Sequence, residues 1–325
     1  RPASSPPTRR PSPPDMEKGV AALTGATGFL GRALCEVLSA DGWTLRVLAR
    51  PEVEPPPGAE VVTGRLADQP ALERLAQGAK LVVHVAGLVK ARTPAGFGPV
   101  NVEGARRIAE AAARRAPEAH FVMVSSLSAR APHLSAYAAS KAAGEAAVRQ
   151  VLAPERLTVV RPSAIYGPGD RETLALFRAV ARLPVLPSPG PPSARLALIH
   201  VADAARQIAT LAERPPDGAT WALADGRPEG YGWREIVDQV ARAVGRRPAL
   251  LPTPRAAILA LGALGSLAGR LGPAQIMTLG KAREALHGDW SVRPEELAPA
   301  RPPPRFDLAA GFADTVRWYR AHGWL

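Results

Sequence analysis

The amino-acid sequence predicts an α/β fold, in which a doubly wound parallel sheet is followed by a smaller, mostly helical C-terminal region. Three observations predict it. Short β-like runs alternate with helical stretches, a glycine-rich turn joins the first run to the first helix, and 325 residues are enough for one large domain and a smaller one.

The predicted strands are short runs of apolar and β-branched residues. They lie at 20–23, 44–48, 60–62, 81–85, 121–124 and 157–160. The segments between them carry apolar residues at helical spacing, as Leu30, Leu34 and Leu38 do after the first run. Such an alternation forms a parallel sheet with helices on both faces, and ligands bind at the carboxyl ends of its strands.

A glycine-rich turn follows the first predicted strand directly. It reads Thr24-Gly25-Ala26-Thr27-Gly28-Phe29-Leu30-Gly31. Gly25 permits the tight turn, Gly28 lets the backbone approach a pyrophosphate, and Gly31 allows close packing of the helix. In this strand-turn-helix context the motif predicts a Rossmann-type dinucleotide site, with Thr24, Thr27, Phe29 and Leu30 as further cofactor-binding candidates.

Arg50 ends the second predicted strand, where NAD-binding domains usually place an acid against the ribose 2′-hydroxyl. A guanidinium at this position can hold a 2′-phosphate, which favours NADP(H) over NAD(H). NAD(H) stays open, because an ordinary exposed arginine is the alternative interpretation in an arginine-rich chain.

Tyr137 and Lys141 open the helical stretch after the fifth predicted strand. Their i, i+4 spacing puts the phenol and the ammonium on one helix face, where the cation is expected to lower the pKa of the tyrosine. Tyrosine can then exchange a proton with a substrate oxygen. Ser126, at the end of the fifth strand, is the candidate hydrogen-bond donor to that oxygen, with Ser125 and Ser128 as rivals.

The alternation of strands and helices loosens after about Gly167, and this sets the predicted domains. We expect a dinucleotide-binding Rossmann domain over 18–214, with a substrate-region insertion at about 168–195, and a substrate-binding region over 215–325. In the latter, helices are expected near 233–244, 255–271, 274–287 and 308–322.

Residues 256–268 form an apolar run that is about half the length needed to cross a bilayer, so no transmembrane segment is expected. A buried or lid helix is the first interpretation. Shallow, peripheral membrane contact and a hydrophobic substrate wall are the alternatives.

The composition excludes several classes of protein. The net charge is +12, but the arginines are scattered without an RNA- or DNA-binding signature, so we expect no nucleic-acid partner. The single cysteine, Cys35, excludes an internal disulfide, and the six histidines lack paired ligand spacing, so we expect no metal site.

The first residues of the sequence are rich in proline, and 1–17 are expected to be a disordered extension. Arg9 and Arg10 are not followed by the apolar region of an export signal. We therefore expect the protein to be cytoplasmic. The folded pattern begins just after Met16, which we expect to be the natural start.

Several motifs in the same order resemble one known family. They are TGATGFLG, the VVHVAG run, Asn101 in NVEGARRIAEAA, VSS, YAASK and RPSAIYGPGD, and they cover most of residues 19–213. Together they resemble the extended short-chain dehydrogenase/reductase superfamily, in its NAD-dependent epimerase/dehydratase branch.

The resemblance implies roles for particular residues. Ser126 matches the serine of the family's catalytic triad, Tyr137 its acid/base and Lys141 the residue that binds the nicotinamide ribose. By the same analogy Ala86 and Gly87 border the cofactor, Pro162 and Ser163 lie near the nicotinamide, and Asn101 has a structural or active-site role. A homodimer is expected by analogy.

The sequence departs from the family pattern at three places. Gly64-Arg65-Leu66 stands where the family often has Gly-Asp-hydrophobic, so the adenine contact must differ; Leu66 remains a cofactor-binding candidate and Asp68 is not assumed to replace the missing acid. The site of Ser126 lacks the Thr-Asp-Glu of sugar-nucleotide dehydratases. No asparagine follows Asn101, although epimerases usually present one to the sugar diphosphate.

The missing asparagine and the position of Arg50 favour an NADP(H)-dependent oxidoreductase, resembling the dihydroflavonol-reductase and 3β-hydroxysteroid-dehydrogenase groups. We expect it to move hydride to or from a carbonyl or secondary alcohol of a small, hydrophobic molecule. One alternative is an NAD-dependent nucleotide-sugar epimerase. Another is a non-catalytic dinucleotide-binding subunit or sensor.

Overall fold

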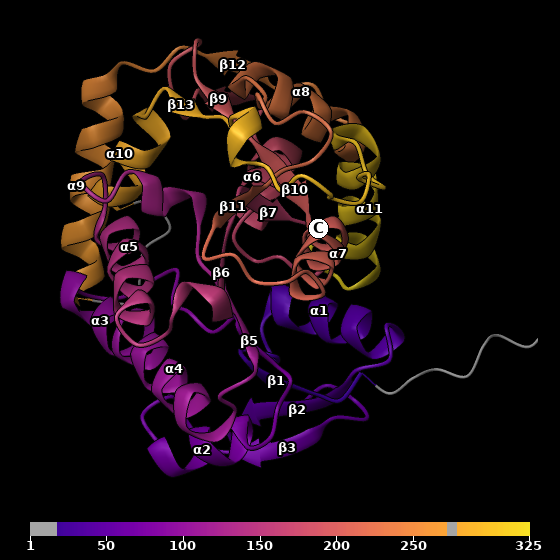
Figure 1. Cartoon of the computed structure of the whole chain (residues 1–325). Coiled ribbons are helices and arrows are strands. Elements are labelled where there is room, and N and C mark those ends of the chain that lie inside the picture. The colour runs from indigo at the N-terminus through magenta and orange to yellow at the C-terminus, as the bar shows by residue number, and fades with distance from the viewer. Residues whose placement is uncertain (1–17, 272–277) are drawn as a thin grey trace, which may run out of the picture.

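The computed structural model describes residues 18–271 and 278–325, and it is centred on a seven-stranded parallel sheet (Figure 1). Across the sheet the strands are β11 (Thr220–Leu223), β6 (Leu157–Pro162), β5 (His120–Val124), β4 (Leu81–His84), β1 (Val20–Thr24), β2 (Thr44–Ala49) and β3 (Glu60–Thr63). The order reverses beside β1, as in a doubly wound sheet. The predicted fold class and all six predicted strands are confirmed.

The seventh strand, β11, was not predicted from the sequence. It is a four-residue run that follows a proline-rich connection, and it pairs in parallel with β6, for example Thr220 with Val159. Its pairing partner, rather than its own pattern, makes it a strand.

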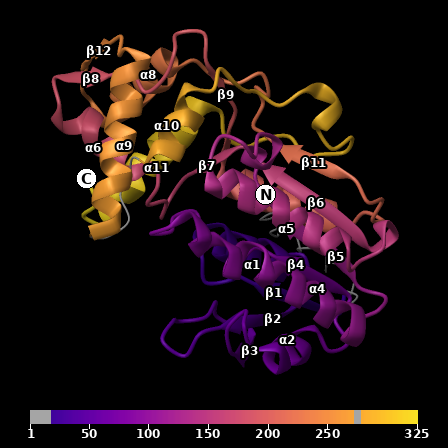
Figure 2. The ribbon, with the colours of Figure 1, turned by 90° about the vertical axis from the view of Figure 1, so that its left-hand side faces the viewer.

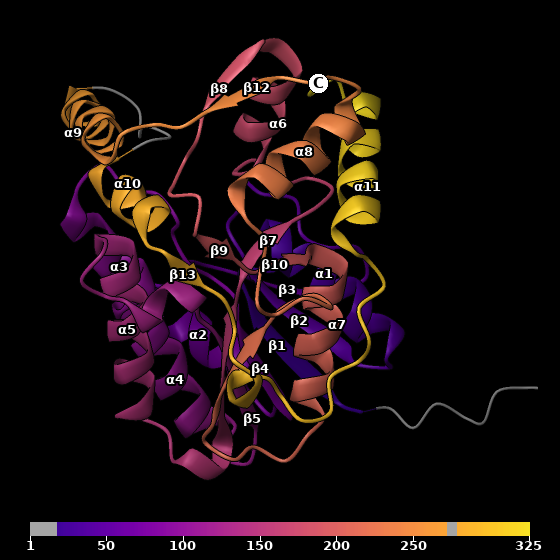
Figure 3. The same cartoon turned by 90° about the horizontal axis from the view of Figure 1, so that it is seen from above.

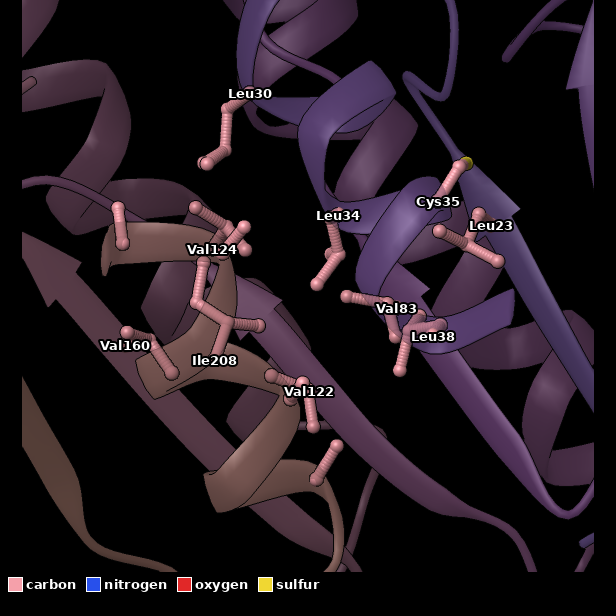
Figure 4. Close-up of a cluster of buried hydrophobic side chains, with 14 of the residues drawn as sticks. Leu23, Leu30, Leu34, Cys35, Leu38, Val83, Val122, Val124, Val160 and Ile208 are labelled. Atoms are coloured by element: carbon pink, nitrogen blue, oxygen red, sulfur yellow. The ribbon is translucent and has the colours of Figure 1, made fainter. Parts of the chain in front are cut away.

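Helices cover both faces of the sheet, as Figures 1 and 3 show. One face is covered by α1 (Phe29–Ala40) and α7 (Val201–Ala212), the other by α2 (Gln69–Ala76), α4 (Glu103–Arg115) and α5 (Ala136–Arg149). On the first face Leu34, Val83 and Ile208 are completely buried (Figure 4). Their removal from water is the main term that fixes α1 and α7 to the strands.

Cys35 belongs to this core and is 2% exposed. Burial raises the pKa of its thiol to about 11, so Cys35 is a protonated packing residue.

A second core lies beyond the carboxyl ends of the strands. It is formed by α6 (Leu174–Arg182), α8 (Trp233–Val244) and α11 (Leu308–Ala321). Aromatic rings pack edge to face in this core. Phe177 of α6 lies 5.4 Å from Tyr319 of α11, and Tyr166, which precedes α6, lies 4.8 Å from Phe312 of α11, between ring centres. The C-terminal aromatic residues therefore hold the last helix in place.

Short elements connect the two cores. The strand pairs are β7 (Ala164–Tyr166) with β10 (Leu198–His200), β8 (Val185–Pro187) with β12 (Ala249–Leu251), and β9 (Arg195–Leu196) with β13 (Asp289–Trp290). The short helices are η1 (Pro94–Phe97), α3 (Gly98–Asn101), η2 (Leu127–Arg130), η3 (Pro154–Arg156) and η4 (Pro294–Glu296).

Two further helices, α9 (Arg255–Leu271) and α10 (Leu279–Leu286), pack on each other at the margin of the molecule (Figure 2). The helix expected near 255–271 is thus confirmed. The start of the helix expected near 274–287 and the proline-rich extension 1–17 lie outside the described residues. Within the described residues, no helix has the length and apolar character needed to cross a bilayer.

Candidate active site

The glycine-rich turn lies where β1 passes into α1, and two of its glycines have no space for a side chain. Gly25 has φ +74°, and a Cβ there would lie 2.5 Å from the amide nitrogen of Ala86. A Cβ on Gly31 would lie 2.0 Å from the carbonyl oxygen of Gly25. The backbone is therefore compact at the α1 N-terminus, where free amides favour a bound anion.

Thr24, which precedes this turn, fixes the neighbouring strand. Its hydroxyl lies 2.7 Å from Nδ1 of His84, at the end of β4. Burial, with Lys141 nearby, lowers the pKa of His84 to about 3, so its ring is neutral. His84 is a hydrogen-bonded core residue, and the described residues contain no cluster of three metal-ligating side chains.

Tyr137 and Lys141 lie on α5, whose N-terminus is capped by the Ser135 hydroxyl. Tyr137 stands in the first turn, where it interacts with the hydroxyl of Ser126. Lys141 lies one turn later, is 5% exposed, and donates from Nζ to the carbonyl oxygen of Val124 at 2.9 Å. The structure thus brings the three predicted residues together at the carboxyl end of β5.

The predicted effect of Lys141 on the tyrosine is wrong for this structure. Burial raises the pKa of Tyr137, and the Ser126 interaction lowers it less. Burial also lowers the pKa of Lys141 to about 8. The reason is that the ammonium bonds to a strand-end carbonyl, while desolvation acts on the phenol itself.

Asn101 connects the loop after β4 to α5. Its side-chain oxygen accepts from the Leu88 amide at 2.8 Å, and its amide nitrogen donates to the Leu88 carbonyl oxygen at 3.0 Å and to the Ser140 hydroxyl at 2.9 Å. Ser140 in turn donates to the carbonyl oxygen of Tyr137 at 2.7 Å. Asn101 therefore fixes the first turn of α5 against the loop that contains Ala86 and Gly87.

Of the two rival serines, Ser125 has its hydroxyl engaged elsewhere. The Ser125 hydroxyl donates to Glu145, whose carboxylate also accepts two hydrogen bonds from Arg161, at 2.9 and 2.6 Å. Ser128 donates its amide to the Ser126 hydroxyl at 3.2 Å. Sequence reasoning missed Glu145, although it continues the i, i+4 series from Tyr137 through Lys141.

A polar group without a partner lies at the end of β6. Ser163 is 5% exposed, and its hydroxyl has no hydrogen-bond partner among the described residues. Buried hydroxyls are normally satisfied, so this one fits a ligand group. Together with the compact turn of Gly25 and Gly31, it makes the carboxyl edge of the sheet suitable for a dinucleotide.

The ends of β2 and β3 carry two arginines. Arg50, 54% exposed, lies 3.7 Å from the Glu52 carboxylate, and Arg65 lies 3.0 Å from the same carboxylate. Asp68 accepts from the Ala71 amide as the N-cap of α2, and Leu66 packs against Gly104. The departure at Gly64-Arg65-Leu66 therefore puts a second cation near Arg50.

A cavity of about 300 Å³ opens beside Tyr137. Its wall combines residues 89–94 and Phe97 with the start of α5 and with parts of α9 and α10. The Tyr137 ring lies between Phe97, 6.1 Å away between ring centres, and Nζ of Lys281, 5.9 Å from its centre. Lys281 was missed from the sequence because α10 carries no motif that indicates its neighbour in space.

Comparison with known proteins agrees with this architecture. The family model described as NAD dependent epimerase/dehydratase family matches residues 21–224. The ceramide reductase of Caulobacter vibrioides (strain NA1000 / CB15N) is 50% identical over 313 residues, which are 95% of this chain and 96% of that protein.

Two more distant proteins share parts of this similarity. The 4-hydroxy-2-methyl-3-oxo-4-farnesyl-3,4-dihydroquinoline-1-oxide ketoreductase of Stigmatella aurantiaca is 32% identical over 228 residues, 63% of this chain and 68% of that protein. The UDP-glucose 4-epimerase of Thermus thermophilus, solved in complex with NAD, has the same fold. Its TM-score is 0.68 at 22% identity, over 93% of this chain and 99% of that one.

The family model covers most of the sheet and the residues gathered at its carboxyl edge, and the identity to the ceramide reductase extends through the C-terminal region. The chain therefore belongs to the NAD dependent epimerase/dehydratase family, and it is an NAD(P)-dependent oxidoreductase of the extended short-chain dehydrogenase/reductase type.

Proposed function

We propose that this enzyme uses NADPH to reduce a ketone on a ceramide-like lipid, in which a polar amide headgroup carries long hydrocarbon chains. The observation that carries the proposal is the 50% identity to a ceramide reductase over 95% of the chain. The cavity supports it, because Tyr137 lies in its wall beside α9, a helix rich in alanine and leucine.

In the proposed reaction Tyr137 is the general acid. Its phenol, kept protonated by burial, gives its proton to the ketone oxygen, and the Ser126 hydroxyl donates a hydrogen bond to the same oxygen. When bound, the dinucleotide supplies the hydride to the carbonyl carbon. Lys141 holds the nicotinamide ribose and positions the phenol. Such proton transfer contributes about 10²- to 10⁴-fold to the rate.

For the cofactor we propose a preference for NADP(H). Arg50 and Arg65 stand together at the ends of β2 and β3, where a 2′-phosphate would lie. Glu52 faces both guanidinium groups. A backbone hydrogen bond is the main cause that lowers the pKa of its carboxyl, and the positive charges of Arg65 and Arg50 lower this pKa further. A 2′-phosphate would compete with Glu52 for these cations through charge-assisted hydrogen bonds.

The experiment that tests the function follows NADPH absorbance in the presence of a 3-oxo amide lipid in detergent. We expect oxidation of NADPH and one molecule of alcohol per NADPH consumed. If the purified enzyme consumes no NADPH with this ketone and instead interconverts UDP-sugars with tightly held NAD, the proposal is wrong.

A further inference from the structure

The outward face of α9 is apolar between residues 256 and 268, after the exposed Arg255 at the start of the helix. Its residues between 256 and 268 that are exposed are Ala256, Ala257, Ala260, Leu261, Ala263, Leu264, Leu267 and Ala268. The three leucines are 56%, 64% and 57% exposed, and their spacing of three residues aligns them in one stripe. A helix on a protein surface usually presents charged and polar residues to water.

The inner face of α9 explains this inverted arrangement. Gly262 lies so close to α10 that a Cβ there would be 2.7 Å from Cβ of Ala282, and Ser266 accepts from the Leu279 amide at 2.8 Å. Ile258, Gly262 and Ser266 thus face the protein, while Leu261, Leu264 and Leu267 face outward. The helix lies at the margin of the molecule, far from β3, in Figures 1 and 2.

The cavity at Tyr137 is continuous with this helix, and its rim is basic. Gly265, Ser266 and Gly269 of α9 form part of its wall. The charged side chains that line it are Lys90, Arg92, Lys281, Arg283 and Glu284. Lys90 pairs with Glu172 at 2.7 Å, and Glu284 accepts from Ser135. The lining therefore has an excess of positive charge beside an apolar stripe.

We propose that the outward face of α9 docks on an anionic phospholipid bilayer, with its leucines among the acyl chains and the basic rim against the headgroups. Basic residues near an apolar face are the combination that binds anionic lipid surfaces. A second copy of the chain would bring a like-charged rim to the same place, which disfavours self-association here.

The docking brings the cavity mouth to the membrane surface. A lipid ketone then reaches Tyr137 by sliding its polar end out of the bilayer, without exposing its chains to water. This part of the inference rests on the proposed function, whereas the docking itself rests on α9 and the basic rim.

The test is co-sedimentation of the full chain with vesicles of phosphatidylglycerol or of phosphatidylcholine. We expect binding to the anionic vesicles that weakens as salt is added. The double variant Leu261→Glu/Leu264→Glu should bind them about 100-fold or more weakly, since each buried leucine is worth roughly 10-fold or more. Val61→Glu is the matched control, because Val61 is 42% exposed on β3 and should leave vesicle binding unchanged.

NADPH affinity of each variant, measured by calorimetry, checks that the fold is intact. Turnover of a short-chain 3-oxo amide dissolved in water should be the same in wild type and double variant. Turnover of a lipid ketone carried in vesicles should be lower in the double variant, because that variant binds the vesicles more weakly. Vesicle binding without any ketone turnover would contradict the proposed function and support the docking surface.

Equal binding of wild type to both vesicle types, or unchanged binding of the double variant, would overturn the docking proposal. So would a wild-type dimer that ignores vesicles and becomes a monomer in the double variant, because α9 would then be an interface between copies.

Discussion

Lys141 is buried, and burial disfavours the protonated, charged form of its side chain. It is 5% exposed, and burial lowers its pKa from the ordinary 10.5 to about 8, although Glu145 raises it again. A lysine with a lower pKa in the folded state costs stability while it is protonated. A cation held at such a cost beside the end of β5 is consistent with the proposed role in binding the nicotinamide ribose.

This burial predicts a pH-dependent effect of Lys141→Met. Between pH 8 and 10.5 the unfolded wild-type chain binds more protons than the folded one, so wild-type stability gains with pH relative to the variant. The difference in unfolding free energy should shift by up to about 3 kcal/mol over this window. Urea titrations of both proteins across the window measure it, and a difference that is independent of pH would contradict the burial argument.

Arg50 predicts the cofactor preference. Replacement by Asp puts a negative charge against a 2′-phosphate and leaves a carboxylate suited to the ribose 2′-hydroxyl of NADH. Arg50→Asp should weaken NADPH binding by about 10- to 100-fold, the value of one or two charge-assisted hydrogen bonds, and spare NADH. Calorimetric titration with each cofactor checks this, and equal affinities before and after the change would remove the argument for NADPH.

At the scale of elements, the turn between β1 and α1 depends on its glycines. Gly31→Ala would force a Cβ to within 2.0 Å of a backbone oxygen, so we expect a loss of about 2–3 kcal/mol in stability and loss of NADPH binding. Gly98→Ala is the matched control: Gly98 has helical φ and ψ, and a Cβ there would meet nothing within 4 Å. Thermal unfolding and NADPH titration compare the two, and equal behaviour would contradict the packing argument.

The elements that sequence reasoning predicted are those whose signal is local. Strands β1 to β6 have apolar runs of their own, and the turn around Gly25 has a spacing that sterics require. Strand β11 became a strand only through its pairing with β6. The approach of Ser126 to Tyr137 followed from both lying at the end of β5, which a parallel sheet dictates.

The features that the sequence did not predict depend on tertiary contacts. The pKa of Tyr137 is raised mainly by burial. The spacing of residues along a helix does not predict how deeply a side chain is buried. Lys281 approaches the Tyr137 ring from a segment 144 positions further along the chain, so no local pattern indicates the contact. The outward leucines of α9 were visible as an apolar run, but which face they occupy was decided by Gly262 and Ser266.

At the scale of the whole molecule, the site joins two parts of the chain. The strand ends supply the glycine turn and Ser126, and α5 supplies Tyr137 and Lys141 beside them, while α9 and α10 from the C-terminal region complete the cavity wall. In this fold ligands bind at the carboxyl edge of the sheet. The proposed lipid specificity therefore depends on α9 and α10, and the proposed chemistry depends on the sheet.

The measurement that tests the central claim most directly is transfer of deuterium from NADPH that carries deuterium at both C4 positions to a 3-oxo amide lipid, in wild type and Tyr137→Phe. We predict deuterium in the alcohol formed by wild type, and a rate about 10³-fold lower in the variant, with NADPH affinity changed by less than about threefold because only the phenolic proton is lost. Full transfer by the variant, or no labelled alcohol from wild type, would contradict the account.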